Sequence, residues 1–529
     1  MLLSSHTVFP SAALGAAVCL AISIIASLLG PKKIYPSGPK PWPLVGNMLY
    51  FAQILQDPDN ELRKLAKQFR GLCTLWVGMT PAFVINSPED AKELLDKRGR
   101  LYSDRPPRNI FSERVWPKRL VFERAGDETR QQRRLFHDFL TLKNAHSLRK
   151  YQDYESNMML CDLLSEPAEF LSHSERYSMS VMFSVVYATR ISKLTHPIMG
   201  AFMHIRNEIL ERLQPGKMLI DYLPFLEKLP HFLQPWVKVA DDLWAKESSI
   251  HKAFLAPLEK QIEAGEKPVC FGAGVLRAQK EGNMDEVQVL SILGMAIFAG
   301  YETTASVIQF FFKIMAMHPH CLKAAQEEID LVVGRSRLPT WEDEEKLPYI
   351  RALVKEVSRF GPSLNMGIPH TNLEEDNYHS FTIPKGSSMI PNITALNKNP
   401  DHYGDPEVFR PERFLGLNLT AAEAAVHPDH RQRDHYNYGF GRRICQGIHV
   451  AEASLFIVFA RVLWGFDITA EAGTTLDMND NLWTLVAKPN PCRLRITARS
   501  DGIRDLIRQT ARDAQTDILD VDCIELPQL

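Results

Sequence analysis

The chain has 529 residues, and its 61 Lys and Arg nearly balance 63 Asp and Glu, so the formal charge is −2. This balance argues against a nucleic-acid partner recruited by bulk electrostatic attraction. The eight cysteines are scattered without a C-x-x-C pair, which argues against a disulfide framework or a structural zinc site and fits a reducing compartment.

The N-terminal segment is long and apolar enough to cross a bilayer. Residues 11–29 carry no charge, and with the apolar residues before them they reach the ~20 residues that a spanning helix needs. Lys32 and Lys33 follow, with no Lys or Arg upstream, so the positive-inside rule places the rest of the chain in the cytosol. The alternative is a cleaved signal peptide, which has a basic region before a shorter apolar stretch. We expect a membrane anchor over residues 1–30.

A proline-rich hinge follows the anchor and leads into the globular part. The prolines within residues 31–45 forbid helix and favour a stiff, extended connector. The globular part over residues 46–500 opens with a predicted helix at 61–69 and a strand pair at 72–78 and 82–85. Residues 501–529 form a charged tail with some helical period.

The longest predicted helix runs to about Met317. We expect Asn283 to cap it, because Glu286 stands three residues on. The helix is apolar on nearly every face, which indicates burial on all sides. A second transmembrane span is the alternative, but Glu302 and Thr303 lie in mid-run, and a charge at a bilayer centre costs at least ~3 kcal/mol. A buried acid beside a hydroxyl suggests function.

Two charged motifs precede the most informative stretch. Glu356 and Arg359 share a helix face at i and i+3, a pair that at a surface is worth little. Arg413 follows in Phe409-Arg410-Pro411-Glu412-Arg413-Phe414.

Three glycines and two arginines surround Cys445 in the stretch Tyr438-Gly439-Phe440-Gly441-Arg442-Arg443-Ile444-Cys445-Gln446-Gly447, before an apolar helix. A helix N-terminus carries partial positive charge, so we expect a lowered thiol pKa here. The glycines let backbone approach something large and flat, and the arginines offer charge to an anion. Together these features describe a haem pocket with a cysteine axial ligand.

Other interpretations of this stretch are weaker. A lone cysteine is usually a small buried hydrophobe. A dinucleotide-binding loop would need a third glycine where Ile444 stands. A cysteine–histidine nucleophile site is also possible, but no nearby residue pattern indicates one.

The stretch resembles the cytochrome P450 signature F-G-x-G-x-R-x-C-x-G, with Tyr438 in place of the usual Phe. Three further motifs follow the order of that family. Ala299-Gly300-Tyr301-Glu302-Thr303-Thr304 resembles A-G-x-[DE]-T-[TS], and the motifs at Glu356 and Arg413 resemble E-x-x-R and P-E-R-F. Residues 125–134 resemble the region of W-R-x-x-R-R, with Thr129 in place of the tryptophan, although a solvated basic helix face is the alternative. The resemblance covers about residues 36–500.

This resemblance implies a mainly α fold with small β-sheets, the cytochrome P450 fold, preceded by a single N-terminal transmembrane helix. It also implies haem b as cofactor, with Cys445 as the axial ligand of the iron. The other cofactor-binding residues that it implies are Arg133, His370 and Arg443 at the propionates, and Tyr438, Gly439, Gly441 and Gly447 in the cysteine loop.

The same resemblance assigns the remaining site residues. Gly300 would leave room for O₂ beside the haem, and Glu302 and Thr303 would relay protons. A buried network of Glu356, Arg359 and Arg413 would hold the cysteine loop. Residues 363–368 and either Trp483 or Leu485 would lie near substrate, and residues 101–122 would form the loop over the pocket.

The implied function is a monooxygenase that inserts one atom of O₂ into an apolar substrate. No flavin or nicotinamide domain is recognisable, so we expect electrons from NADPH–cytochrome P450 reductase, which could dock on Arg130, Arg134 and Arg442. The expected surroundings are membrane lipid and the cytosolic face of the endoplasmic reticulum. The region from Gly367 to Gly386 resembles fungal P450s of secondary metabolism, including the O-methylsterigmatocystin oxidoreductase-like group.

Two alternatives stay open. One is a haem-thiolate isomerase, dehydratase or peroxygenase on the same fold, which needs no reductase. The other is a non-catalytic, membrane-tethered haem-binding protein.

Overall fold

The computed structural model describes residues 33–43, 45–214, 217–218, 220, 224–282 and 284–527. The expected anchor over residues 1–30 and the predicted cap Asn283 lie outside these residues.

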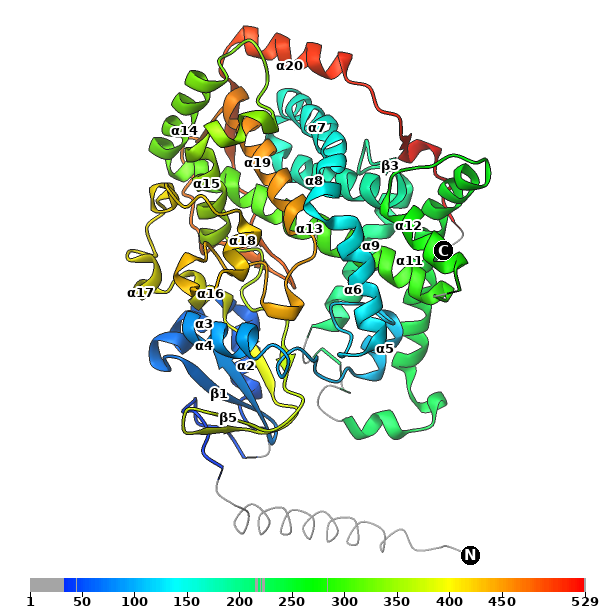
Figure 1. The fold of residues 1–529 in the computed structure, drawn as a ribbon, viewed down its shortest axis with the longest axis vertical. Helices are drawn as coiled ribbons and strands as arrows, with labels where there is room; N and C mark the ends of the chain where they lie inside the picture. Colours follow the sequence, from blue (N-terminus) through cyan, green and yellow to red (C-terminus); the bar gives the residue numbers. More distant parts are fainter. Residues whose placement is uncertain are drawn as a thin grey trace, which may run out of the picture.

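A small lobe at one end of the molecule contains the main sheet (Figure 1). Its strand order is β1 (Leu72–Val77), β2 (Thr80–Ile85), β7 (Ser388–Pro391) and β4 (His370–Thr371). The predicted strand pair is confirmed: β1 and β2 are antiparallel, with Leu72 opposite Ile85. β7 pairs parallel with β2 and antiparallel with β4, which sets His370 opposite Met389. The lobe also holds α2 (Met48–Gln56), α3 (Pro58–Gln68), α4 (Pro88–Ala91), β5 (Asp376–Tyr378) and β6 (Phe381–Ile383).

Helices build the larger part of the molecule (Figure 1). They are α5 (Ile110–Val115), α6 (Asp127–Leu140), α7 (Leu142–Ser165), α8 (Phe170–Tyr187), α9 (Pro197–Leu213), α11 (Pro235–Glu263), α12 (Phe271–Lys280), α13 (Glu286–Met317), α14 (Pro319–Val332), α15 (Pro348–Phe360), α16 (Ile393–Asn397), α17 (Pro400–Tyr403), α18 (Ala421–Val426), α19 (Ile448–Gly465) and α20 (Asp501–Asp513). The described residues form four two-stranded sheets. These pair β5 with β6, β3 (Thr189–Arg190) with β12 (Leu519–Asp520), β8 (Phe466–Ala470) with β11 (Leu494–Ala498), and β9 (Asn481–Trp483) with β10 (Ala487–Pro489).

The long helix α13 crosses the centre of the body. Its cap is Asp285 rather than Asn283: the Asp285 side chain accepts from the Gln288 backbone N–H, and the Gln288 side chain accepts in return. Asp285 is the N-cap because it directly precedes the first helical residue and has the extended backbone conformation of a capping residue. By length and composition α13 and α19 could each cross a membrane, but both are mostly buried in the body. The stacked rings of Phe311 and Phe459, 4.0 Å apart, join them.

The predicted helical period of the C-terminal tail is confirmed by α20, whose Ile503 and Ile507 are buried. Beyond it the chain runs down one side of the molecule (Figure 1) and adds β12 to β3 in parallel. Val521 and Ile524 then pack into the apolar cluster that includes α9, α11 and α12.

Candidate active site

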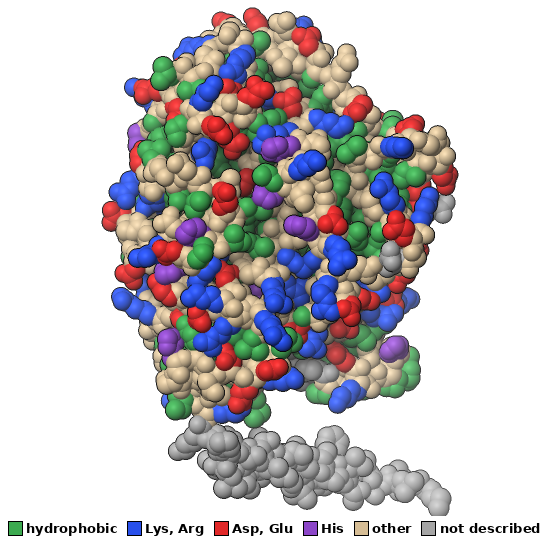
Figure 2. All heavy atoms as spheres, in the orientation of Figure 1, with side chains coloured by type: hydrophobic (Ala, Val, Ile, Leu, Met, Phe, Trp, Pro, Cys, Tyr) green, Lys and Arg blue, Asp and Glu red, His purple; other side chains and the backbone are tan. Residues whose placement is uncertain are grey.

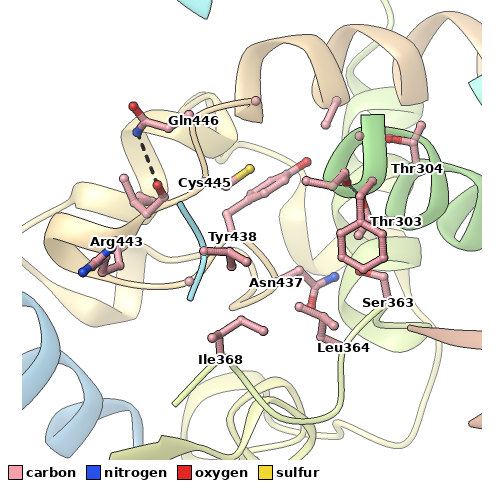
Figure 3. Close-up of a pocket in the computed structure, with 18 of the residues that line it drawn as sticks. Thr303, Thr304, Ser363, Leu364, Ile368, Asn437, Tyr438, Arg443, Cys445 and Gln446 are labelled. Atoms are coloured by element: carbon pink, nitrogen blue, oxygen red, sulfur yellow. Dashed lines mark hydrogen bonds between the residues drawn. The ribbon is translucent and has the colours of Figure 1, made fainter. Parts of the chain in front are cut away.

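A cavity of about 320 Å³ lies between α13 and the loop that carries Cys445. Figure 3 shows Thr303 and Thr304 on one side and Tyr438, Cys445 and Gln446 on the other. Most of the lining is apolar, and the predicted pocket residues Ser363, Leu364, Ile368 and Leu485 are part of it.

Glycines shape the loop before Cys445. Gly439 and Gly441 have positive φ angles of 72° and 48°, and a Cβ on Gly441 would lie 2.2 Å from the Leu95 carbonyl oxygen. The Gly441 N–H instead donates to Asp96 Oδ1 at 2.6 Å. The Cys445 N–H donates to the Tyr438 carbonyl at 2.9 Å, and Gly447 is the N-cap of α19. The loop is thereby held so that the thiol reaches the cavity.

The expected lowering of the Cys445 pKa is wrong for the protein chain by itself. Burial raises the pKa of this thiol, and the Gly447 N–H and Arg133 oppose the rise only in part. The accessible surface of Cys445 faces the interior cavity, so the sulfur is shielded from bulk water, and desolvation outweighs the helix terminus that begins three residues later. A metal cation would reverse this balance, because a coordinating thiol loses its proton.

Three arginines meet at the same cavity. Arg133 of α6, Arg443 of the cysteine loop and Arg105, which the sequence reasoning missed, all line it. Burial lowers the pKa of Arg105 to about 9, and repulsion from Arg443 and Arg133 adds to the effect. The nearby carboxylate Asp104 is already bound to Arg124. Two carboxylates such as haem propionates fit this excess of positive charge. The only local signal for Arg105 was its place before Pro106 and Pro107.

Two of these arginines have guanidinium groups that are already held by backbone carbonyls. Arg443 donates to the carbonyls of Ser103, Leu120 and Glu123. Arg105 donates to those of Val121, Ile368 and Pro369. Their orientation is therefore set by the chain before any ligand is bound.

His370 of β4 also lines the cavity. Its Nδ1 lies 2.7 Å from the Tyr102 carbonyl oxygen and donates to it. Burial, with Arg105 and Arg443 adding to it, lowers the pKa of His370 to about 3. Contact with a propionate stays a prediction, and it would require a proton on Nε2 as well.

The α13 motif does not place all its residues as expected. Thr303 and Thr304 line the cavity, and the Thr303 hydroxyl donates to the Ala299 carbonyl at 2.8 Å. Gly300 lines it too, but a Cβ there would lie 2.4 Å from Met182 Sδ. The missing side chain of Gly300 therefore makes room for Met182 of α8. The space beside the Gly300 Cα is filled by this methionine.

Glu302 does not line the cavity. Its carboxylate is paired with Arg206 of α9, and Lys488 of β10 lies 3.3 Å away. The side chain is buried, and Oε2 has no hydrogen-bond partner among the described residues. A proton relay through Glu302 stays a prediction, and the geometry gives it no direct path.

The predicted contacts among Glu356, Arg359 and Arg413 are confirmed. Arg359 donates to both Glu356 oxygens at 2.7 and 2.8 Å, and Arg413 Nε donates to Oε1 at 3.1 Å. The Arg359 guanidinium also reaches the Asn397 carbonyl at 2.8 Å. The Asn397 side chain accepts from the Tyr436 N–H at 2.9 Å, two residues before the glycine-rich loop. No local pattern had marked Asn397.

The two departures from the family motifs have their own partners. Thr129 is buried, and its hydroxyl donates to the Arg124 carbonyl. The Tyr438 hydroxyl donates to Glu452 Oε1 of α19 at 2.8 Å. Burial raises the pKa of Glu452 to about 7.

Comparison with known proteins decides the family. A protein-family sequence model described as Cytochrome P450 matches residues 36–496 of the chain. The chain belongs to the cytochrome P450 family. It is 45% identical to cytochrome P450 monooxygenase polD of Polytolypa hystricis over 95% of this chain and 97% of that protein. It is 33% identical to cytochrome P450 monooxygenase virE of Hypocrea virens over 90% of this chain and 88% of the other.

The fold agrees with that of solved P450s. A zebra fish cytochrome P450 with progesterone superposes with a TM-score of 0.71 at 22% identity, covering 84% of this chain and 99% of that chain. The protein is thus a haem-containing P450 monooxygenase with a mainly helical fold and small sheets.

Proposed function

We propose that this P450 inserts one oxygen atom from O₂ into an apolar organic substrate of secondary metabolism. The observation that carries the proposal is the cavity, whose apolar lining runs from Thr303 on α13 to Cys445. When bound there, haem supplies the activation of O₂.

The chain's own residues would bind the haem, orient it and keep water away from the substrate. Cys445 would hold the iron and donate electron density to it. Arg105, Arg133 and Arg443 would hold the propionates. The apolar wall would exclude water from the substrate, and Thr303 and Thr304 are the hydroxyl-bearing residues of α13 that line the cavity.

A basic face supports NADPH–cytochrome P450 reductase as electron donor. Lys and Arg side chains gather near the middle of the face in Figure 2, over α6 and the cysteine loop. Arg130, Arg134 and Arg442 are exposed there, although Arg130 also pairs with Asp127. Such a face would steer an acidic partner to the cysteine side.

We also propose a single-pass anchor in the endoplasmic reticulum with the haem domain in the cytosol. The exposed apolar side chains of Trp42, Met79, Phe225 and Phe232 support contact with lipid. Phe232 is 84% exposed. The β1–β2 hairpin and the segment after α9 lie at the same end of the molecule (Figure 1).

The test is reconstitution of the purified protein with the reductase and NADPH. We expect a thiolate-type reduced-CO spectrum and NADPH-dependent product, with substrates found by screening compounds for a high-spin shift. A haem-thiolate isomerase, dehydratase or peroxygenase remains the second candidate, because Glu302 is engaged away from the cavity. Product without NADPH would favour it, and haem without any product would favour a haem-binding protein.

A further inference from the structure

Arg119 lies in the pocket loop (residues 101–122), directly before the cavity-lining Leu120, Val121 and Phe122. Its side chain is 1% exposed, and its Nη2 donates to Glu247 Oε2 of α11 at 2.8 Å. Burial alone would raise the pKa of Glu247, but Arg119, with help from His251, lowers it. The two side chains therefore form an ionised pair inside the protein, outside the cavity.

The surroundings hold the Arg119 guanidinium in one place. It lies 5.2 Å from the centre of the Trp116 ring, which packs 4.9 Å from Phe298 of α13. A Cβ on Gly294 of α13 would come within 2.8 Å of both terminal nitrogens of Arg119. The pocket loop, α11 and α13 therefore meet at this side chain.

The backbone that follows Arg119 accepts hydrogen bonds from two of the arginines that line the cavity. The Val121 carbonyl accepts from Arg105 at 2.9 Å. The Leu120 and Glu123 carbonyls accept from Arg443 at 3.3 and 2.8 Å. A shift of this backbone would move the cavity wall and both arginines together.

We propose that the Arg119–Glu247 pair is a latch that fixes the pocket loop to α11 and so positions the cavity wall and the two arginines. The proposal rests on the proposed function only in assigning the cavity to haem and substrate. Arg119 and Glu247 are positioning residues, because neither lines the cavity. Removing Glu247 leaves Arg119 as an uncompensated buried charge.

The chain offers a matched control in Arg114 and Asp241. This pair joins α5, inside the pocket loop, to the same helix α11, with Arg114 Nε 2.6 Å from Asp241 Oδ1. Its side chains are 39% and 48% exposed, and exposed pairs of this kind contribute little.

The test uses the full-length haem protein and 4-phenylimidazole as a probe that binds at the iron. Its binding and release are followed by stopped-flow absorbance of the haem band. For Glu247→Gln we expect Kd to rise about tenfold, mainly through faster release, because the loop loses its charge pair. Arg119→Lys, which keeps the charge but not the fork, should fall in between. For Asp241→Asn we expect a change below about twofold.

A double variant, Arg119→Met with Glu247→Leu, covers the case in which single variants lose haem. Removing both charges should restore haem content, since no lone charge stays buried, while probe binding stays weak. Unchanged probe kinetics in a haem-loaded Glu247→Gln would overturn the latch, as would an equal effect of Asp241→Asn. Haem loss in the double variant with intact helical circular dichroism would overturn it too, because packing rather than charge would then be responsible. The readout is ligand binding, so a failed turnover assay would count against the proposed function alone.

Discussion

Glu302 of α13 is paired with Arg206 of α9, and both side chains are buried beside the cavity-lining Thr303. Lys488 of β10 lies 3.3 Å from the same carboxylate oxygen. Neighbouring residues of one motif thus face different surroundings: the hydroxyl faces the cavity, and the acid joins α13 to α9 and β10.

Replacing Glu302 should therefore act strongly on stability. We expect Glu302→Gln to lower the free energy of unfolding by about 3–5 kcal/mol, because the buried Arg206 loses its counter-charge, while Lys488 keeps Glu175 as its partner. Chemical denaturation of the haem-loaded protein measures it. Glu175→Gln is the control, since Glu175 binds Lys488 at 2.9 Å but is partly exposed, and its effect should be smaller. Equal stability of Glu302→Gln and the wild type would contradict the assignment.

The Glu356 network predicts loss of haem. We expect Glu356→Ala and Arg359→Ala to abolish haem incorporation, because either leaves a buried charge costing about 3–5 kcal/mol and loosens Asn397 beneath the cysteine loop. Absorbance of the purified variants gives the haem content. Glu61→Ala, which breaks the exposed Glu61–Lys64 pair, should keep a normal content. A normal haem spectrum in either network variant would refute the role.

Cys445→Ala should abolish the thiolate-type reduced-CO spectrum, because among the described residues Cys445 is the only cysteine that lines the cavity. Cys73→Ala, Cys161→Ala and Cys321→Ala serve as controls and should keep it, since these thiols lie elsewhere in the fold. A persisting thiolate spectrum in Cys445→Ala would assign the ligand to another residue.

His370 predicts an acid-sensitive fold in the haem-free protein. Its folded pKa is about 3, below the usual value near 6.5, so the unfolded chain binds a proton that the folded chain refuses. Its contribution is complete above pH 6.5 and is lost as pH falls towards 3, by up to about 1.4 kcal/mol per pH unit. Denaturation between pH 4 and 7 measures this slope. His370→Gln should flatten it, and bound haem should do so in part because propionates raise the pKa. An unchanged slope in His370→Gln would rule the histidine out.

The C-terminal tail predicts a structural contribution from beyond the family match. Val521 is fully buried, while Leu526 in the same segment is 53% exposed. Val521→Asp should lower the free energy of unfolding by about 3 kcal/mol, because it buries an unpaired charge where an apolar group packed. Leu526→Asp should change it by less than about 0.5 kcal/mol. Thermal unfolding of both compares them, and similar melting temperatures would show that the tail is not docked in solution.

Motifs that depend on local spacing were predictable from the sequence. The glycine-rich loop before Cys445 and the i, i+3 pair of Glu356 and Arg359 needed no distant partner to be recognised. Arg105 was missed because its partners Ile368 and Pro369 lie 263 and 264 residues along the chain. Asn397 and Glu452 contact residues 39 and 14 positions away, and no regular spacing predicts such contacts.

By itself the sequence indicated the family, the cysteine that we expect to bind the haem iron, and the long central helix, because glycine spacing and apolar periodicity can be read from neighbouring residues. Only the tertiary structure decided which way the side chains of α13 face. It turned Glu302 towards Arg206 and set Gly300 against Met182, because those partners come from α9 and α8. It also reversed the expected pKa shift of Cys445, since the packing of the whole domain determines how far a thiol is removed from water.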